Sequence, residues 1–311
     1  MEVVVSAILT VVGLIMLCFG GNWLVSGGVA IAKKFRISSL VIGMTIVAYG
    51  TSTPELAASV AAAGEHSAII LGNIIGSNIA NVGMVIGVSA ILVPLAVKKS
   101  VLRKELLIML GISFLLVLLS IDGEISQYDG ILLLVGLGVF TFYTYKDAMK
   151  QREENKEKTE KGKNNIYLKS AGLIGIGVVL LYVGAILTVD NAVILAQEFG
   201  LSEKIIGLTV IAIGTSLPEL ITAIIAIRKG HTDIGIGTII GSNIYNILMI
   251  MGVGAALGGV IIASDVYVDY AIMIIFSLSL LIAIKTGIIS RVMGICLAIG
   301  YVAYLIVTFF K

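Results

Sequence analysis

Long apolar stretches, separated by short polar ones, follow one another along almost the whole chain. Each stretch is close to the ~20 residues that an α-helix needs to cross a bilayer. The short-period alternation with long polar loops that is typical of an outer-membrane β-barrel does not occur. The pattern therefore predicts an all-α membrane protein with about ten transmembrane helices. The predicted spans are residues 3–31, 37–63, 68–97, 102–121, 127–149, 168–196, 203–228, 232–262, 267–285 and 289–309.

The composition agrees with this pattern. Of the 311 residues, 58% are hydrophobic and only 13% are charged, whereas about a quarter of the residues of a soluble domain are charged. Cys18 and Cys296 both fall inside predicted spans, so we expect packing residues and no disulfide framework. The net charge of +2 gives no reason to expect a nucleic-acid partner.

The distribution of positive charge predicts the orientation of the chain. With the N-terminus outside, 19 of the 21 Lys and Arg residues fall on the inner side, the exceptions being Lys204 and Lys311. Cytoplasmic loops of membrane proteins carry an excess of Lys and Arg. We therefore expect a multi-pass protein of the cell (inner) membrane, with both termini outside and the 146–167 loop in the cytoplasm.

An internal repeat divides the chain into two halves. The segment VIGMTIVAYGTSTPELAASV at 41–60 matches IIGLTVIAIGTSLPELITAI at 205–224, an offset of 164 residues. The segment GNIIGSNIAN at 72–81 matches GTIIGSNIYN at 237–246, an offset of 165. Self-similarity of this kind is the sequence signature of a repeated structural unit.

The two halves are predicted to enter the membrane in opposite directions. Each half holds five predicted spans, and an odd number of spans inverts the second half relative to the first. We therefore predict two inverted five-helix repeats, 1–145 and 168–311, joined by a solvated cytoplasmic linker at 146–167 that is rich in Lys, Glu and Asn. Transporters built from inverted repeats hold their substrate near the bilayer midplane, between the repeats.

Glu55 and Glu219 are the two acidic residues that the pattern places deep inside apolar spans. An ionisable group at that depth is costly and is a functional-site candidate. A protonated Glu could instead hold two helices together. Because the two residues occupy equivalent places in inverted repeats, we expect their carboxyl groups to converge on one central point.

The residues around the two glutamates supply oxygen ligands. Pro54 and Pro218 interrupt their helices, and a proline inside a helix displaces the carbonyl four residues earlier. Carboxylates, carbonyls and hydroxyls suit Ca²⁺ and Na⁺, whereas zinc or copper sites need Cys or His clusters. The candidate hydroxyl ligands beside Glu55 and Glu219 are Thr51, Ser52, Thr215 and Ser216.

The second motif contributes polar residues at a four-residue spacing, which places them on one helix face. We expect them to complete the ion site, although they could also act as amide links between helices. These residues are Ser77 and Asn81 in the first half, and Ser242 and Asn246 in the second. The glycines of the same motif, Gly72 and Gly76 or Gly237 and Gly241, are predicted to allow close contact between helices.

The doubled Gly-Thr-Ser-x-Pro-Glu-Leu and Gly-Ser-Asn-Ile motifs resemble those of the calcium/cation antiporter superfamily, and in particular its prokaryotic Na⁺/Ca²⁺ exchanger group. The resemblance covers nearly the whole chain. It implies that the residues named above are ion ligands, and that the carbonyl groups of Ala48 and Ala212 bind Na⁺. Exchangers of this group often carry Asp where this chain has Asn246.

The expected activity is secondary-active antiport of Ca²⁺ against Na⁺ by alternating access, with a Ca²⁺/H⁺ antiporter as the alternative. No enzymatic activity and no cofactor are expected, because Ca²⁺ and Na⁺ are the transported substrates. A channel would carry a flux without a counter-ion. An intramembrane hydrolase using the carboxylate pair is a further alternative, but nothing beyond the two glutamates resembles a nucleophile–base pair, and the carbonyl-exposing prolines beside them suit ions better. The lipid bilayer is the expected surrounding, and the chain is expected to work as a monomer.

Overall fold

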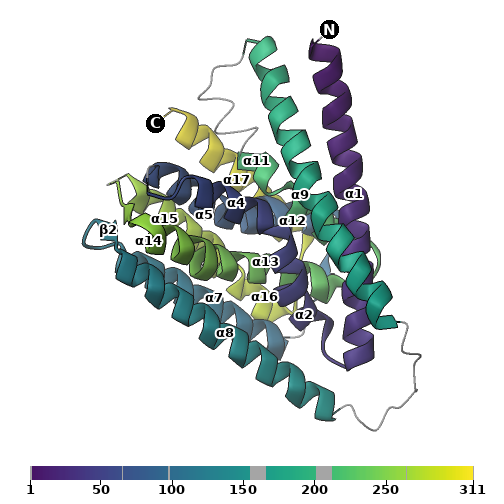
Figure 1. The fold of residues 1–311 in the computed structure, drawn as a ribbon. Helices are drawn as coiled ribbons and strands as arrows, with labels where there is room; N and C mark the ends of the chain where they lie inside the picture. The colour runs from purple at the N-terminus through teal and green to yellow at the C-terminus, as the bar shows by residue number, and fades with distance from the viewer. Residues whose placement is uncertain are drawn as a thin grey trace.

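The computed structural model describes residues 2–64, 66–96, 99–154, 166–200, 212–263 and 265–310. Helices dominate this part of the chain (Figure 1). Seven of the described helical stretches are long and apolar enough to cross a membrane. They are Val3–Phe35, Ser67–Leu92, Gln127–Glu153, Leu168–Glu198, Thr232–Gly258, Val266–Thr286 and Arg291–Thr308.

The first helix of each half packs against the other along its length. Helix α1 (Glu2–Phe35) and helix α9 (Ile166–Glu198) lie side by side in Figure 1. Glycines bring the two backbones together, since a Cβ atom on Gly20 would stand only 2.9 Å from the carbonyl oxygen of Gly177. Small residues at a helix interface permit this close approach in membranes.

From the Gly-Thr-Ser motif onward, the remaining described elements occur in the same order in both halves, with two helices of the second half in the place of one of the first. In the first half these are α2 (Ser39–Ile42), η1 (Gly43–Val47), α3 (Ala48–Thr51), α4 (Thr53–Ala61), α5 (Ser67–Ala80), η2 (Asn81–Ile86), α6 (Gly87–Leu92), β1 (Leu95–Ala96), α7 (Lys99–Leu119), β2 (Glu124–Ile125) and α8 (Gln127–Glu154). In the second half these are α11 (Ala212–Thr215), α12 (Leu217–Arg228), α13 (Thr232–Tyr245), η4 (Asn246–Met251), α14 (Gly252–Gly258), β3 (Val260–Ile261), α15 (Val266–Ser279), α16 (Leu281–Thr286), β4 (Ile288–Ile289) and α17 (Arg291–Phe310).

Two short β-ladders, which the sequence pattern did not predict, link the halves crosswise. Strand β1 of the first half pairs with β4 of the second, and β2 pairs with β3, both antiparallel. Each ladder lies at the end of an apolar span, where the pairing satisfies backbone groups as the helices end. The cross-pairing joins each half to the other at two places.

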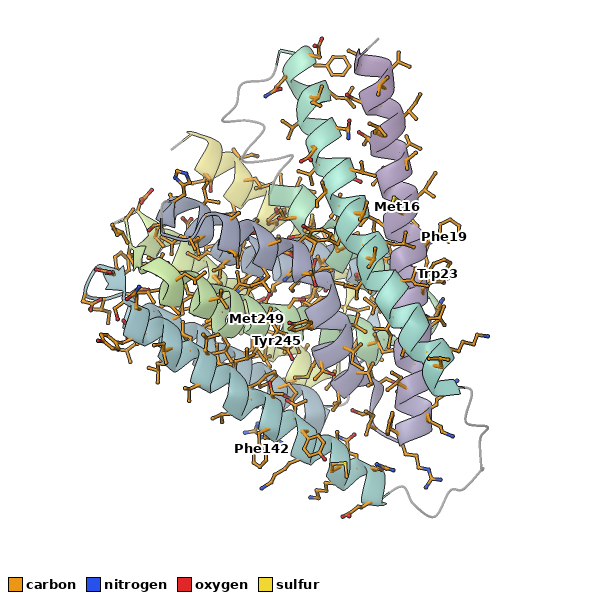
Figure 2. All side chains as sticks on the ribbon, in the orientation of Figure 1. Met16, Phe19, Trp23, Phe142, Tyr245 and Met249 are labelled. Carbon is orange, nitrogen blue, oxygen red and sulfur yellow. The ribbon has the colours of Figure 1, made fainter. Side chains whose placement is uncertain are left out.

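Apolar side chains cover the outer faces of the bundle and also fill its interior (Figure 2). Phe19 on α1 and Phe142 on α8 are exposed, whereas Tyr245 and Met249 are buried between helices. Exposed apolar surface on this scale is typical of a protein that faces lipid. The described core centres on α5 with η2 and on α13 with η4.

The predicted boundaries hold for most spans, with one change at the linker. Helix α8 continues through Lys146 to Glu154, so the first part of the predicted 146–167 linker is helical, and α9 begins at Ile166. The beginning of the predicted 203–228 span, including Lys204, lies outside the described residues.

Candidate cation-binding site

A helix break places each of the two buried glutamates. Helix α3 ends at Thr51 and α4 begins at Thr53, because Ser52 leaves helical geometry with ψ at 10°. The second half repeats this break at Ser216, with ψ at 3°. In both halves a proline occupies the first turn of the new helix, where its missing N–H costs no hydrogen bond.

The breaks leave Glu55 and Glu219 in the first turns of α4 and α12, and both side chains are buried. The N-terminal turn of a helix favours negative charge, because its backbone N–H groups have no partner within the helix. The two carboxyl groups also interact electrostatically with each other. Two carboxylates in one apolar interior need positive charge to offset them.

Hydroxyl groups from α3, from α13 and from the break between α3 and α4 lie around the carboxyl group of Glu219. Its Oε1 accepts a hydrogen bond of 3.1 Å from Ser52 Oγ and one of 3.3 Å from Ser242 Oγ. Thr51 Oγ1 lies 3.5 Å from Ser242 Oγ. The network crosses between the halves, since Thr51 and Ser52 belong to the first half and the other two residues to the second.

The α4 side of the site is held by a different contact. Asn73 on α5 donates through Nδ2 to the backbone carbonyl of Glu55 and to Ser59 Oγ, both at 3.0 Å. This pair of hydrogen bonds ties the first turns of α4 to α5. It positions the backbone of Glu55 and leaves its carboxyl group free for other partners.

Amide side chains form a second layer across the halves. The π-helical segments η2 and η4 begin at Asn81 and Asn246, and π-bulges of this kind occur frequently at functional sites. Asn81 Nδ2 donates to Asn243 Oδ1, and Asn246 Nδ2 donates to Asn78 Oδ1, both at 3.0 Å. All four side chains are about 1% exposed.

Several buried oxygens of this region have no hydrogen-bond partner among the described residues. They are Glu55 Oε2, Glu219 Oε2, Asn81 Oδ1, Asn246 Oδ1 and Ser216 Oγ. A buried polar atom without a partner is destabilising by about 1–3 kcal/mol. Carboxylate, amide and hydroxyl oxygens are the ligand types that Ca²⁺ and Na⁺ take. This set is therefore chemically suited to a hard cation.

The predicted site residues differ in how directly the structure connects them. Hydrogen bonds bring together Thr51, Ser52, Glu219 and Ser242. Ser77 and Ser216 are buried, and Thr215 ends α11 one residue before the break. The carbonyl of Ala48 already accepts from Thr51 Oγ1 at 3.1 Å and from the Ser52 backbone N–H at 3.0 Å.

The backbone of Ala212 begins α11, and its side chain lies outside the described residues. The ligand roles of Ala48 and Ala212 remain predictions.

The prediction of close helix contact is confirmed for one pair of glycines and wrong for the other. A Cβ atom on Gly237 or Gly241 would stand 2.6 or 2.5 Å from a backbone carbonyl of α2 or η1. A Cβ atom on Gly72 or Gly76 would meet no described atom within 4 Å. These two glycines line a pocket of about 250 Å³ between α5, α15 and α17, so the face of α5 that they occupy is open.

Sequence reasoning missed two groups of residues. Asn78 and Asn243 lie inside the Gly-Ser-Asn motifs and recur at the same offset of 165. This recurrence was enough to predict them as site residues. Glu105 on α7 is 5% exposed, so Glu55 and Glu219 are not the only buried carboxyl groups. Glu105 was not predicted to be buried, because it follows basic residues at the start of the predicted span 102–121. Its Oε1 accepts a 3.4 Å hydrogen bond from Tyr143.

Comparison with known proteins identifies relatives over the whole chain. A family model described as sodium/calcium exchanger protein matches residues 5–146 and again residues 169–310. The inner membrane protein YrbG of Escherichia coli (strain K12) is 36% identical, covering 96% of this chain and 94% of YrbG. The sodium/calcium exchanger MaX1 of Methanosarcina acetivorans is 32% identical, covering 99% of each chain.

Solved structures of the sodium–calcium exchanger NCX_Mj share the fold. The form soaked with 10 mM Na⁺ and 10 mM Sr²⁺ gives a TM-score of 0.86 at 35% identity, with 98% of each chain covered. The form soaked without Na⁺ and Ca²⁺ gives a TM-score of 0.84 at 34% identity, with 98% of this chain and 99% of NCX_Mj covered.

Proposed function

Because the chain belongs to the sodium/calcium exchanger protein family, we propose that it is a secondary-active antiporter that exchanges Ca²⁺ for Na⁺ across the cell membrane. The observation that carries this proposal is the pair of buried carboxyl groups, Glu55 and Glu219, each with an oxygen that has no partner among the described residues. The two carboxyl groups stand at matched helix breaks. The transported Ca²⁺ and Na⁺ are the substrates, and the proposal involves no enzymatic step and no cofactor.

Charge balance explains how such a site exchanges ions. Two ionised glutamates carry a charge of about −2, which one Ca²⁺ or two Na⁺ would neutralise. An empty site with two negative charges is costly to move through a low-dielectric barrier. A site that holds either substrate is close to neutral and can pass between the two sides. Exchange then follows because only occupied sites cross.

The proposed architecture is two inverted repeats of five spans each, at 1–145 and 168–311, joined by the cytoplasmic linker at 146–167. Its support is the matching order of elements in the two halves, the crosswise pairing of the strands, and a family match that covers each half separately. The orientation, with both termini outside, rests on the excess of Lys and Arg in the inner loops. We propose a monomer as the working unit.

The proposed ligand set follows from the site geometry and the family. The central ligands are the carboxyl groups of Glu55 and Glu219 together with the amide oxygens of Asn81 and Asn246. The hydroxyl groups of the helix breaks and of the Gly-Ser-Asn motifs would surround them. The full set is Ala48, Thr51, Ser52, Glu55, Ser77, Asn81, Ala212, Thr215, Ser216, Glu219, Ser242 and Asn246.

Uptake of ⁴⁵Ca²⁺ into proteoliposomes tests the function directly. Vesicles loaded with Na⁺ and diluted into Na⁺-free buffer should accumulate Ca²⁺, and vesicles with equal Na⁺ on both sides should not. Uptake driven by a pH gradient in the absence of Na⁺ would establish the alternative Ca²⁺/H⁺ antiporter. Uptake that needs no counter-ion would indicate a channel and would refute the proposal.

A further inference from the structure

Two chains of hydrogen bonds run from a methionine sulfur to an amide of the candidate cation site. In the first, Asn78 donates through Nδ2 to Met273 Sδ at 3.7 Å, and Asn78 Oδ1 accepts from Asn246 Nδ2 at 3.0 Å. Asn246 Oδ1 then remains without a partner among the described residues. The chain connects α15, α5 and η4.

The second chain is the counterpart of the first in the other half. Asn243 donates through Nδ2 to Met109 Sδ at 3.6 Å, and Asn243 Oδ1 accepts from Asn81 Nδ2 at 3.0 Å. Asn81 Oδ1 likewise has no described partner. The residues of the two chains correspond at the repeat offset, 165 for the asparagines and 164 for the methionines. All six side chains are buried.

We propose that Met273 and Met109 are positioning residues, which fix the orientation of both amide chains so that the carbonyl oxygens of Asn246 and Asn81 face the cation. An amide offers a donor end and an acceptor end, and its two orientations are close in shape. A thioether sulfur accepts hydrogen bonds and cannot donate one. Each methionine therefore selects the orientation in which the neighbouring amide turns its NH₂ group towards the sulfur.

The orientation of the first amide determines the orientation of the next amide in each series of hydrogen bonds. With its NH₂ group towards Met273, Asn78 presents its oxygen to Asn246, which must then present its own NH₂ group. The carbonyl oxygen of Asn246 is left at the far end, where a cation can bind it. The backbone carbonyl of Asn243 supports the same orientation, since it lies 3.4 Å from Asn78 Nδ2. A reversed Asn78 would direct its oxygen at two acceptors.

The arrangement also accounts for Asn, and not Asp, at position 246 in this chain. A carboxylate has no NH₂ group to donate to Asn78 Oδ1. The Asn246→Asp variant would therefore require Asn78 to turn over and to withdraw its NH₂ group from Met273. The sulfur then opposes the orientation that the carboxylate needs, whereas in the parent protein it supports the orientation that the amide needs.

A double-mutant cycle between positions 273 and 246 separates this role from packing. The readout is Ca²⁺ binding to the purified full-length protein, measured by titration calorimetry. Leu replaces Met at nearly constant volume and is tolerated well in cores. We expect Met273→Leu to weaken Ca²⁺ binding by roughly five- to tenfold, the size of one lost hydrogen bond. In the Asn246→Asp background the same change should weaken binding little or strengthen it.

Two matched variants serve as controls. Met251→Leu alters a buried methionine of η4 whose sulfur accepts no hydrogen bond from the described residues, and it should leave Ca²⁺ affinity unchanged. Met109→Leu acts on the chain that ends at Asn81, so its effect should persist in the Asn246→Asp background. In Na⁺-driven uptake, Met273→Leu should raise KM for Ca²⁺ with kcat retained.

Equal weakening by Met273→Leu in both backgrounds would show that the methionine acts through packing, and no weakening in the parent would show that its sulfur does not orient the amides. Either result overturns the inference. The inference rests on the proposed function, and the two fail differently. A parent protein that binds no Ca²⁺ refutes the function itself, whereas a parent that binds Ca²⁺ without coupling between 273 and 246 refutes only the role of the methionines.

Discussion

Helices α5 and α13 carry almost the same motif, GNIIGSNI and GTIIGSNI, in different surroundings. Every residue of an 18-residue apolar segment within Thr232–Gly258 is buried, whereas 78% of the residues are buried in such a segment within Ser67–Leu92. The difference is concentrated at the glycines: Gly237 and Gly241 contact α2 and η1, while Gly72 and Gly76 line a pocket. Neighbouring elements, and not the motif, decide whether this helix face is closed.

The open face of α5 lines the pocket between α5, α15 and α17. Gly76 is followed directly by Ser77 of the candidate site, and the pocket continues towards Asp265 and Asp269 at the start of α15. In the proposed topology this end of α5 lies on the same side as the termini. Transporters of inverted repeats alternate between two asymmetric arrangements around a fixed site. The difference between α5 and α13 is an asymmetry between the two repeats.

The largest expected effect is the loss of either glutamate. Glu55→Gln and Glu219→Gln should each reduce Na⁺-driven Ca²⁺ uptake to the level of empty vesicles, because the remaining single charge does not balance Ca²⁺. The measurement is ⁴⁵Ca²⁺ uptake, with protein monodispersity checked by size-exclusion chromatography. Glu105→Gln is the matched control, since Glu105 is also buried but lies on α7, and it should retain exchange. Full exchange by either site variant would mean that the two halves do not contribute equally.

The next effect distinguishes the closed helix face from the open one. Gly241→Ala places a methyl group 2.7 Å from the Met44 Cα atom, and it should destabilise the protein by roughly 1–3 kcal/mol through overpacking. Gly76→Ala meets no described atom and should leave the melting temperature unchanged. In the alternative arrangement of the two repeats, a neighbouring helix would cover the glycine face of α5. Gly76→Ala should therefore slow exchange and keep Ca²⁺ affinity. Equal melting temperatures for the two variants would contradict the asymmetry of the faces.

Much of this architecture was predictable because its signals are local. The length of apolar runs predicts helices, and the repeated Pro54 and Pro218 predict the breaks that place the two glutamates. Hydrogen bonds bring the predicted residues Ser52 and Ser242 to Glu219, and their role as ion ligands stays a prediction.

The unpredicted features all depend on partners distant in the chain. The crosswise strands pair residues that lie between 135 and 194 positions apart, and the Asn–Asn pairs join residues 162 and 168 positions apart. The glycine prediction failed at Gly72 and Gly76 for the same reason, since close contact requires a second helix at that face. A pattern read along one chain cannot specify which face a distant helix covers.

A smaller effect separates the two serines at the helix breaks. Ser52 Oγ donates to Glu219, whereas Ser216 Oγ has no described partner. Ser52→Ala should lower stability without Ca²⁺ by about 1 kcal/mol, the net contribution of a hydrogen bond. Ser216→Ala should leave that stability unchanged and weaken Ca²⁺ binding. Melting temperatures with and without Ca²⁺ measure both effects, and identical behaviour of the two variants would contradict the assignment.

The smallest expected effect concerns the residues that precede α5 and α13, His66 and His231, which correspond at the offset of 165. Burial, with nearby Lys33 and Lys229, lowers the pKa of His231. The unfolded chain therefore binds a proton at His231 at a higher pH than the folded protein does. Stability contributed by neutral His231 is present above the unfolded pKa of ~6.5 and falls as the pH decreases from there towards the lower folded pKa.

The prediction for these histidines is a difference in pH dependence. Between about pH 7.5 and 5.5, a window around the unfolded histidine pKa, the melting temperature should fall less in His231→Gln than in the parent protein. His66 is exposed, so His66→Gln serves as the matched control and should keep the parental slope. Thermal unfolding in detergent at several pH values measures all three. An unchanged slope in His231→Gln would show that the closed surroundings of α13 do not extend to the residue that precedes it, and would confine the asymmetry between the two helices to their glycine faces.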